Sequence, residues 1–129
     1  MVRRVTLGAG ALSAAAEGDQ RVRANLEALR RHNTEVVLPA VAIAESTTGE
    51  GTRDARVNLV IRGCQVASTT ELIARRAGAL RYRARRPDAT VDAIVVATAE
   101  LVGGGALLTF DREDCTALAE NTSVRVEGP

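Results

Sequence analysis

The spacing of apolar residues along the chain predicts short strands that alternate with longer helices. Short apolar runs between turn residues are typical of strands in a buried parallel sheet, whereas apolar residues three or four positions apart mark one face of a helix. On these patterns we predict five strands, at 2–7, 35–38, 65–68, 106–110 and 123–126. The predicted helices run from the turn at 8–10 through 16, over 20–32, from 40 to about 48, over 52–62 and 70–86, from beyond Pro87 to Val102, and over 112–120.

The stretch from Asp88 to Asp114 has the most regular pattern. A helix-length apolar run ends at Gly103-Gly104-Gly105, residues that favour the left-handed and extended backbone of a helix C-terminus. The continuous apolar run 106–110 follows, as expected of a strand buried on both faces. Alternation of this kind predicts an α/β fold with a mainly parallel sheet that is covered by helices on both faces.

Composition limits the classes of protein that fit. With 129 residues and no repeat or linker, the chain is expected to form a single domain over 1–129. The net charge of +1 gives no overall attraction to nucleic acid or membranes. All basic residues except one histidine are arginines, for which codon usage in a GC-rich genome and the binding of phosphates are alternative explanations. Tyr82 and Phe110 are the only aromatic residues, so the core must consist of aliphatic side chains.

The cysteines and the N-terminus indicate a cytoplasmic protein. Cys64 and Cys115 lack the spacing of a disulfide framework or a zinc site, which favours buried free thiols in a reducing compartment. The N-terminal apolar stretch is rich in alanine and glycine and is followed at once by charges, so a core strand is favoured over a signal peptide. We expect no membrane span, because no apolar run is long enough.

Four acidic residues are candidates for a chemical role, although structural roles are also open to them. Asp92 falls in the first turn of a helix, where it also stabilises the helix dipole. Asp111 ends a strand and is a candidate N-cap, with Asp114 three residues later. Glu45 is the only charge between residues 36 and 49 and shares a helix face with Val41, so it would be costly to bury without a partner.

Together, these carboxylates predict a site for a hard cation. Ligand sites of parallel sheets lie beyond the carboxyl ends of the strands, where Asp111 is placed and where helices carrying Asp92 and Glu45 begin. Carboxylates without histidine or cysteine favour Mg²⁺ or Mn²⁺, which activates water and neutralises phosphodiester charge. Gly8-Ala9-Gly10 suggests a nucleotide-binding turn as an alternative, but the next strand lacks the acidic residue that holds a ribose, and a simple tight turn is favoured.

Four segments, in this order and spacing, resemble a known family over nearly the whole chain. They are VTLGAGALSA, LPAVAIAES with Glu45, TVDAIVVATAE with Asp92, and LLTFDRED with Asp111 and Asp114. They are similar to PIN domains, specifically the VapC-type ribonuclease toxins of bacterial toxin–antitoxin pairs. The resemblance implies a three-layer α/β/α fold with four or five strands, a Mg²⁺- or Mn²⁺-dependent endoribonuclease, a homodimer, and a VapB-like antitoxin whose tail covers the active site.

By the same resemblance, Glu45, Asp92 and Asp111 are catalytic residues and metal ligands, with Asp114 as a further ligand. The family pattern has an aspartate directly after the first strand, and this chain has Gly8 there. Either an inactivating substitution or natural degeneration to a silent binding module explains the glycine. An impaired nuclease is therefore expected.

Other residues near these segments are candidates for contact with RNA. Thr109 precedes Asp111 by two residues and is expected on the same side of the strand, where it would order a water or phosphate. Arg112 is a candidate for contact with a phosphate. A run of arginines in the helix 70–86 is consistent with an RNA track or with a solvated surface. It comprises Arg75, Arg76, Arg81, Arg83, Arg85 and Arg86.

Overall fold

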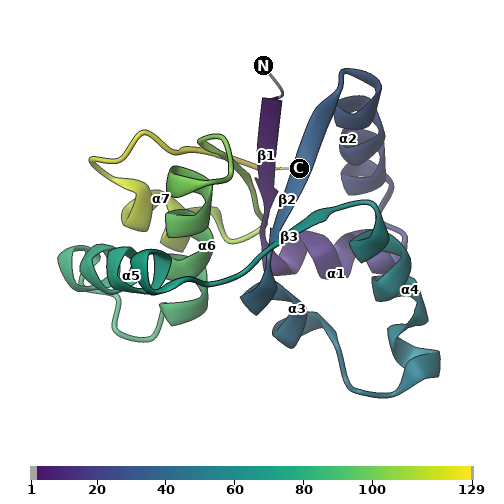
Figure 1. The fold of residues 1–129 in the computed structure, drawn as a ribbon, viewed down its shortest axis with the longest axis horizontal. Helices are drawn as coiled ribbons and strands as arrows, with labels where there is room; N and C mark the ends of the chain where they lie inside the picture. Colours follow the sequence, from purple (N-terminus) through teal and green to yellow (C-terminus); the bar gives the residue numbers. More distant parts are fainter. Residues whose placement is uncertain (1–2, 129) are drawn as a thin grey trace.

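The centre of the molecule is a parallel sheet of five strands, and Figure 1 shows it with helices on either side. The computed structural model describes residues 3–128. The strand order is β3-β2-β1-β4-β5, and each neighbouring pair is parallel. The strands are β1 (Arg3–Leu7), β2 (Thr34–Pro39), β3 (Gln65–Ala67), β4 (Ala106–Leu108) and β5 (Arg125–Glu127). Val2, the first residue of the first predicted strand, lies outside the described residues.

Helices cover both faces of the sheet and form two groups, one on each side of it (Figure 1). One group is α1 (Ala9–Glu17), α2 (Gln20–Arg31) and α4 (Gly51–Arg62), and the other is α5 (Glu71–Ala84), α6 (Thr90–Leu101) and α7 (Arg112–Ala119). The short α3 (Ala40–Ser46) continues directly from the end of β2. The predicted three-layer α/β/α fold is confirmed.

The core is aliphatic, as the composition predicts. Consecutive residues of a strand face opposite layers, so Leu108 joins the cluster under α1 and α2 while Leu107 joins the cluster under α6 and α7. Both aromatic side chains stay outside: Tyr82 is 87% exposed and Phe110 is 48% exposed. Of the two free cysteines, Cys115 is buried as predicted, whereas Cys64 is only partly buried. None of the described helices is both long and apolar enough to cross a membrane.

The path of the chain creates a switch point between β1 and β4. From β1 the chain moves outward in one direction to β2 and β3, and it then returns to the other side of β1 with β4 and β5. Connections leaving the carboxyl ends of β1 and β4 therefore diverge to opposite faces, and ligand sites of parallel sheets typically lie at such a point. Gly8 follows β1 and Asp111 comes three residues after the end of β4, so both lie at this switch point.

The strand 106–110 is shorter than predicted and ends at Leu108. The backbone N–H of Thr109 still donates to Glu127 of β5 (3.0 Å), but the N–H of Asp111 turns back to the Thr109 hydroxyl (3.0 Å). The chain bends at this turn to begin α7, which leaves Phe110 half exposed at the rim. The last strand is likewise shifted by about a residue or two relative to 123–126.

A glycine turn holds the end of α6 against β1. Gly104 and Gly105 have φ angles of 85° and 83°, the left-handed backbone that the glycine triplet predicts. Gly103 is needed for a different reason: a Cβ there would lie 1.8 Å from the Thr6 hydroxyl and 2.9 Å from the Cα of Ala99. The buried Thr6 hydroxyl also donates to the carbonyl oxygen of Gly103 (3.3 Å).

Replacing Gly103 by alanine should therefore destabilise the protein through overpacking, by about 2 kcal/mol or more. Gly78→Ala is a matched control, because Gly78 lies within α5 and a Cβ there meets nothing within 4 Å. The control should stabilise the fold by about 0.5–1 kcal/mol. Urea unfolding of both variants measures the two changes. If Gly103→Ala and Gly78→Ala changed the free energy of unfolding equally and in the same direction, the close packing of Gly103 against β1 would be contradicted.

Candidate metal centre

Three carboxylates meet at the carboxyl edge of the sheet. Asp92 comes from the first turn of α6, whereas Asp111 and Asp114 come from the start of α7. One oxygen of each lies within 4.8 Å of an oxygen of the other two. Residues far apart in the sequence meet here because α6 and α7 both begin at the edge where β1 and β4 end.

Asp111 is not used as a conventional cap. It occupies the N-cap position of α7, but its side chain accepts no hydrogen bond from that helix. Its backbone is fixed instead, because its N–H donates to the Thr109 hydroxyl and its carbonyl accepts from the N–H of Cys115 (3.1 Å). The carboxylate of Asp111 is exposed and free to face the other acids.

The three negative charges perturb one another. Partial burial, reinforced by a shared proton with Asp111 and by the charges of Asp111, Asp114 and Glu45, raises the pKa of Asp92 to about 7 from its usual 3.8. Among residues 3–128, the counter-charge paired with the cluster is the guanidinium of Arg86, which donates to a carboxylate oxygen of Asp114. Negative charge at the cluster is therefore offset only in part by the protein itself.

Glu45 corrects one expectation from the sequence. Its side chain is exposed, so the cost of burying a lone carboxylate does not arise. The reason is that α3 ends at Ser46, and the residues of this helix that reach the two cores are Val41, Ala42 and Ile43 near its start. Glu45 is not part of the group of three close carboxylates, although its charge is near enough to raise the pKa of Asp92.

Gly8 lies at the same edge as the acids. Its N–H donates to the carbonyl oxygen of Leu108 (2.9 Å), and a Cβ at position 8 would lie 3.2 Å from the hydroxyl of Thr109. Its φ of −78° is open to any residue. The backbone therefore has no need of glycine at position 8, and a longer side chain there would start beside the loop that carries Asp111.

A family model described as PIN domain matches residues 7–120. The chain belongs to the PIN-domain family. Among solved structures, a chain from the crystal structure of VapBC2 from Rickettsia felis bound to a DNA fragment from their promoter is similar to it. The TM-score is 0.74 and the sequence identity 13%, with 100% of this chain and 99% of that chain covered. No curated protein sequence matches the chain.

The other predicted site residues of this PIN domain lie around the cluster. Thr109 is 3% exposed, and its hydroxyl accepts from the N–H of Asp111, so it faces the protein interior. Arg112 is exposed at the start of α7, and its side chain lies beside Gly128 at the end of the described chain. Neither side chain joins the three close carboxylates.

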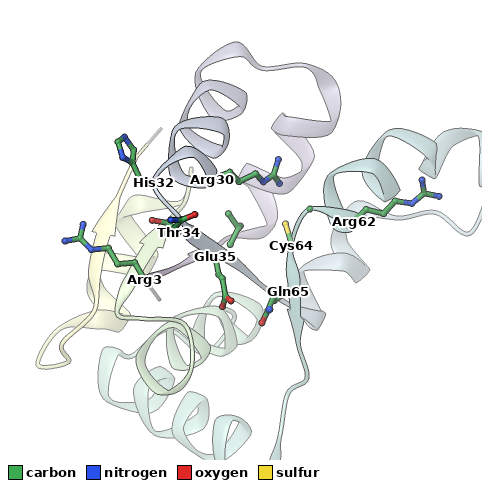
Figure 2. A pocket seen from close by; sticks show the side chains of 11 residues that line it. Arg3, Arg30, His32, Thr34, Glu35, Arg62, Cys64 and Gln65 are labelled. Atoms are coloured by element: carbon green, nitrogen blue, oxygen red, sulfur yellow. The ribbon is translucent and has the colours of Figure 1, made fainter. Parts of the chain in front are cut away.

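A hollow of about 1070 Å³ lies at the opposite, amino-terminal edge of the sheet, where β1, β2 and β3 begin and α2 and α4 end (Figure 2). Several arginines line it, but Figure 2 shows that Arg30 points toward Cys64 while Arg3 and Arg62 point to opposite sides. Because the guanidinium groups do not converge, this hollow has no common point at which they would bind one anion. The acid cluster is the better candidate for the functional site.

Two structural contacts were not foreseen from the sequence. Arg86 was predicted only as part of a run of arginines, whereas its guanidinium binds Asp114. Asp54 is buried, and its carboxylate accepts from Thr48 (2.9 Å) and Gly49 (2.9 Å), which holds the loop between α3 and α4. These hydrogen bonds, above all the one from the N–H of Thr48, lower the pKa of Asp54. The pairing of Arg86 with Asp114 spans 28 residues and depends on how the chain folds back, so no local pattern signals it. The hydrogen bonds of Asp54 are local and depend on the turn at Thr48 and Gly49.

The residues present suit a hard divalent cation. All three close side chains offer carboxylate oxygens, the ligands that Mg²⁺ and Mn²⁺ prefer, and no histidine or ionised thiol competes among them. Burial and the neighbouring carboxylates Asp92, Asp111 and Asp114 raise the pKa of the nearby Cys115 thiol to about 12, which keeps it protonated. A cation at the cluster would relieve the repulsion that raises the pKa of Asp92.

The raised pKa of Asp92 predicts that the metal-free protein loses stability as the pH rises. The folded state keeps a proton on Asp92 up to about pH 7, whereas the unfolded chain loses it near 3.8. The stabilisation that this difference in pKa gives the folded state is therefore complete below pH 3.8 and is lost as the pH rises past about 7. Thermal unfolding in a chelator, from about pH 5.5 to about pH 8.5, should show a falling melting temperature.

Asp92→Asn imitates the protonated form and should flatten that dependence while raising stability at the alkaline end. Asp88→Asn, at an exposed position in the preceding loop, is the control and should keep the slope of the original protein. A slope that persists unchanged in Asp92→Asn would show that another group is responsible.

Proposed function

We propose that this PIN domain is a VapC-like metal-dependent endoribonuclease toxin that cleaves RNA phosphodiester bonds, with activity impaired by Gly8. The observation that carries the proposal is the meeting of Asp92, Asp111 and Asp114 at the switch point of a parallel sheet. Such a cluster of oxygen ligands suits a cation that binds phosphate. Phosphodiester hydrolysis is the chemistry that this combination supports best.

Asp92 and Asp111 are the central ligands in this proposal, and Asp114 and Glu45 complete the set. Mg²⁺ or Mn²⁺, when bound, supplies an activated water and neutralises charge on the phosphodiester. Asp92 gives up its proton as the cation binds, since cation ligation needs the ionised carboxylate. Glu45 is exposed and lies outside the three close carboxylates, so in this proposal it joins them only when its side chain turns toward the bound cation.

Thr109 and Arg112 act in different ways. Because the hydroxyl of Thr109 is buried and accepts from the N–H of Asp111, we assign it a positioning role for that loop. Arg112 follows Asp111 directly and is exposed, so it is available for a phosphate of the bound RNA.

The proposed partners follow from the same family relationship. We expect a VapB-like antitoxin and a homodimer in the cytoplasm, formed by the single domain 1–129. The likeness to VapBC2 from Rickettsia felis supports this expectation through the shared fold.

A catalytically silent PIN-like module is the second candidate, and Gly8 is the observation that favours it. Such a module would dimerise and bind an antitoxin or RNA without cutting. The distinction depends on whether the cluster still binds a cation.

Gly8→Asp should restore a missing ligand, since position 8 lies beside the Asp111 loop and its backbone admits any side chain. We expect Mn²⁺ to bind at least about tenfold more tightly, a gain of about 1.4 kcal/mol, in calorimetric titration. Metal-dependent cleavage of RNA should rise with it. Gly8→Asn is the matched control, because it has the same size and also caps α1 but adds no carboxylate.

The original protein should still show weak Mn²⁺ binding that Asp92→Asn abolishes. If neither the original protein nor folded Gly8→Asp binds Mn²⁺, the nuclease proposal fails and the silent module stands. If Asp and Asn at position 8 have the same effect, the gain comes from capping α1 and not from a ligand.

A further inference from the structure

Tyr82, in the last turn of α5, is 87% exposed. It is the only tyrosine of a chain without tryptophan, and its ring makes up much of the aromatic surface available to the molecule. A tyrosine ring combines an apolar face with a polar hydroxyl, which suits it to contact a ligand at a surface. The residues around Tyr82 therefore indicate which kind of ligand the ring would contact.

The ring lines a shallow pocket of about 300 Å³ with arginines around it. The lining residues are Arg81, Tyr82, Arg85, Arg86 and Pro87. This volume is at the lower end of the range for small-molecule sites. The walls combine one aromatic face with three cations and no acid, a combination that suits a planar base with an attached phosphate.

The three arginines have different roles. Arg81 holds the loop after α5, because its guanidinium donates to the carbonyl oxygen of Pro87 (3.2 Å) and to the hydroxyl of Thr90 (3.0 Å). Arg86 binds Asp114 of the acid cluster. Arg85 is exposed and forms no ion pair with any residue in the described part of the chain, so it is free to bind an anion.

The backbone at Arg85 is unusual. Its φ of 56° lies in the left-handed region, which L-residues other than glycine and asparagine enter at a cost of about 1–2 kcal/mol. Glycine is the usual residue at this position of a helix end. An arginine kept there against its conformational preference is consistent with a role for its side chain.

The pocket adjoins the acid cluster. Arg86 lines the pocket and also reaches Asp114, so the two sites are separated by the length of one arginine side chain. The loop that follows α5 returns to the start of α6, where Asp92 lies (Figure 1). A strand with one phosphodiester at the carboxylates would place a neighbouring nucleotide over Tyr82.

We propose that this pocket is a nucleotide subsite for single-stranded RNA, in which one base stacks on Tyr82 and its phosphate binds Arg85. The inference rests on the proposed function, because it takes RNA as the ligand of the neighbouring acid cluster. Stacking on exposed aromatic rings is how proteins hold unpaired bases, and arginine suits the phosphate.

Self-association is a less suitable use of this surface. In a two-fold symmetric contact centred on the pocket, the unpaired Arg85 of both copies would come close together with no acid of the pocket lining to neutralise it. Like charges opposed in this way are unfavourable, whereas an RNA backbone supplies the missing negative charge.

The absence of tryptophan allows a direct test with the intact protein. Tyrosine emission comes from Tyr82 alone, so stacking of a base should quench it. We would titrate the protein with a single-stranded RNA oligonucleotide in a chelator and measure emission, corrected for RNA absorbance, together with the polarisation of labelled RNA. The subsite is supported if the tyrosine quenching saturates and its midpoint falls at the same RNA concentration as the midpoint of the polarisation curve. Polarisation binding that leaves tyrosine emission unchanged overturns it.

Variants separate stacking from charge. Tyr82→Ala should weaken RNA binding roughly 5- to 150-fold, the range expected for the loss of one stacked base, whereas Tyr82→Phe should keep the affinity. Leu72→Ala, which removes another exposed apolar side chain of α5 (68% exposed), is the control and should change nothing. Equal weakening by Tyr82→Ala and Leu72→Ala would overturn the stacking role.

Arg85→Gly gives a test that misfolding cannot imitate. Glycine suits the φ of 56°, so the variant should melt at a higher temperature and yet bind RNA about tenfold more weakly, with a salt slope lower by about 1. Arg75→Gln removes a charge from the same helix, where Arg75 is paired with Glu71, and should leave RNA affinity nearly unchanged. Equal losses in both arginine variants would show a non-specific charge effect and overturn the subsite.

Two further outcomes separate this inference from the proposed function. Quenching by RNA in a protein whose Gly8→Asp variant neither binds Mn²⁺ nor cuts would support the subsite and refute the nuclease. Complete absence of RNA binding overturns both. Tyrosine emission that depends on protein concentration without RNA would show that a second copy covers Tyr82, and it would overturn the subsite alone.

Discussion

Repulsion among carboxylates at one edge of the sheet is the interaction on which the site of this PIN domain depends. The fold forces Asp92, Asp111 and Asp114 together, and the protein offsets their charge by a proton on Asp92 and by the guanidinium of Arg86. Both are replaceable, because the proton leaves as the pH rises and the ion pair of Arg86 is partly exposed, so that water weakens it. The repulsion among the three carboxylates therefore persists in the metal-free protein, and a bound divalent cation would reduce it.

The scaffold resists this repulsion because α6 cannot move away. Its residues from Ala93 to Ala99 are almost all buried, and its far end is fixed where Gly103 packs against Thr6 of β1. Asp92 therefore stays at the edge even though separation would lower its energy. Part of the free energy of core packing is used in this way to hold like charges together, as is common in functional sites.

The sequence predicts the elements well because the core is made of aliphatic residues at regular spacing. The glycine triplet after α6 and the apolar run of β4 give clear boundaries, and the acids after them fall where parallel strands end. Contacts that depend on long-range geometry could not be predicted. Glu45 shares a face with Val41 and yet is exposed, because the residues of α3 that reach the two cores lie near its start; the pairing of Arg86 with Asp114 and the exposure of Tyr82 likewise depend on where the loop after α5 returns.

The same balance of charge explains what glycine at position 8 changes. A carboxylate at position 8 would start beside the loop of Asp111 and add a further negative charge to a cluster in which Asp92 already holds a proton. In the metal-free protein, glycine at this position spares the fold that repulsion. If the cluster binds a cation as proposed, the same glycine leaves that cation with one carboxylate fewer. The other acids and the counter-charge of Arg86 are in place all the same, so the fold keeps the cluster together even without the aspartate of the family pattern.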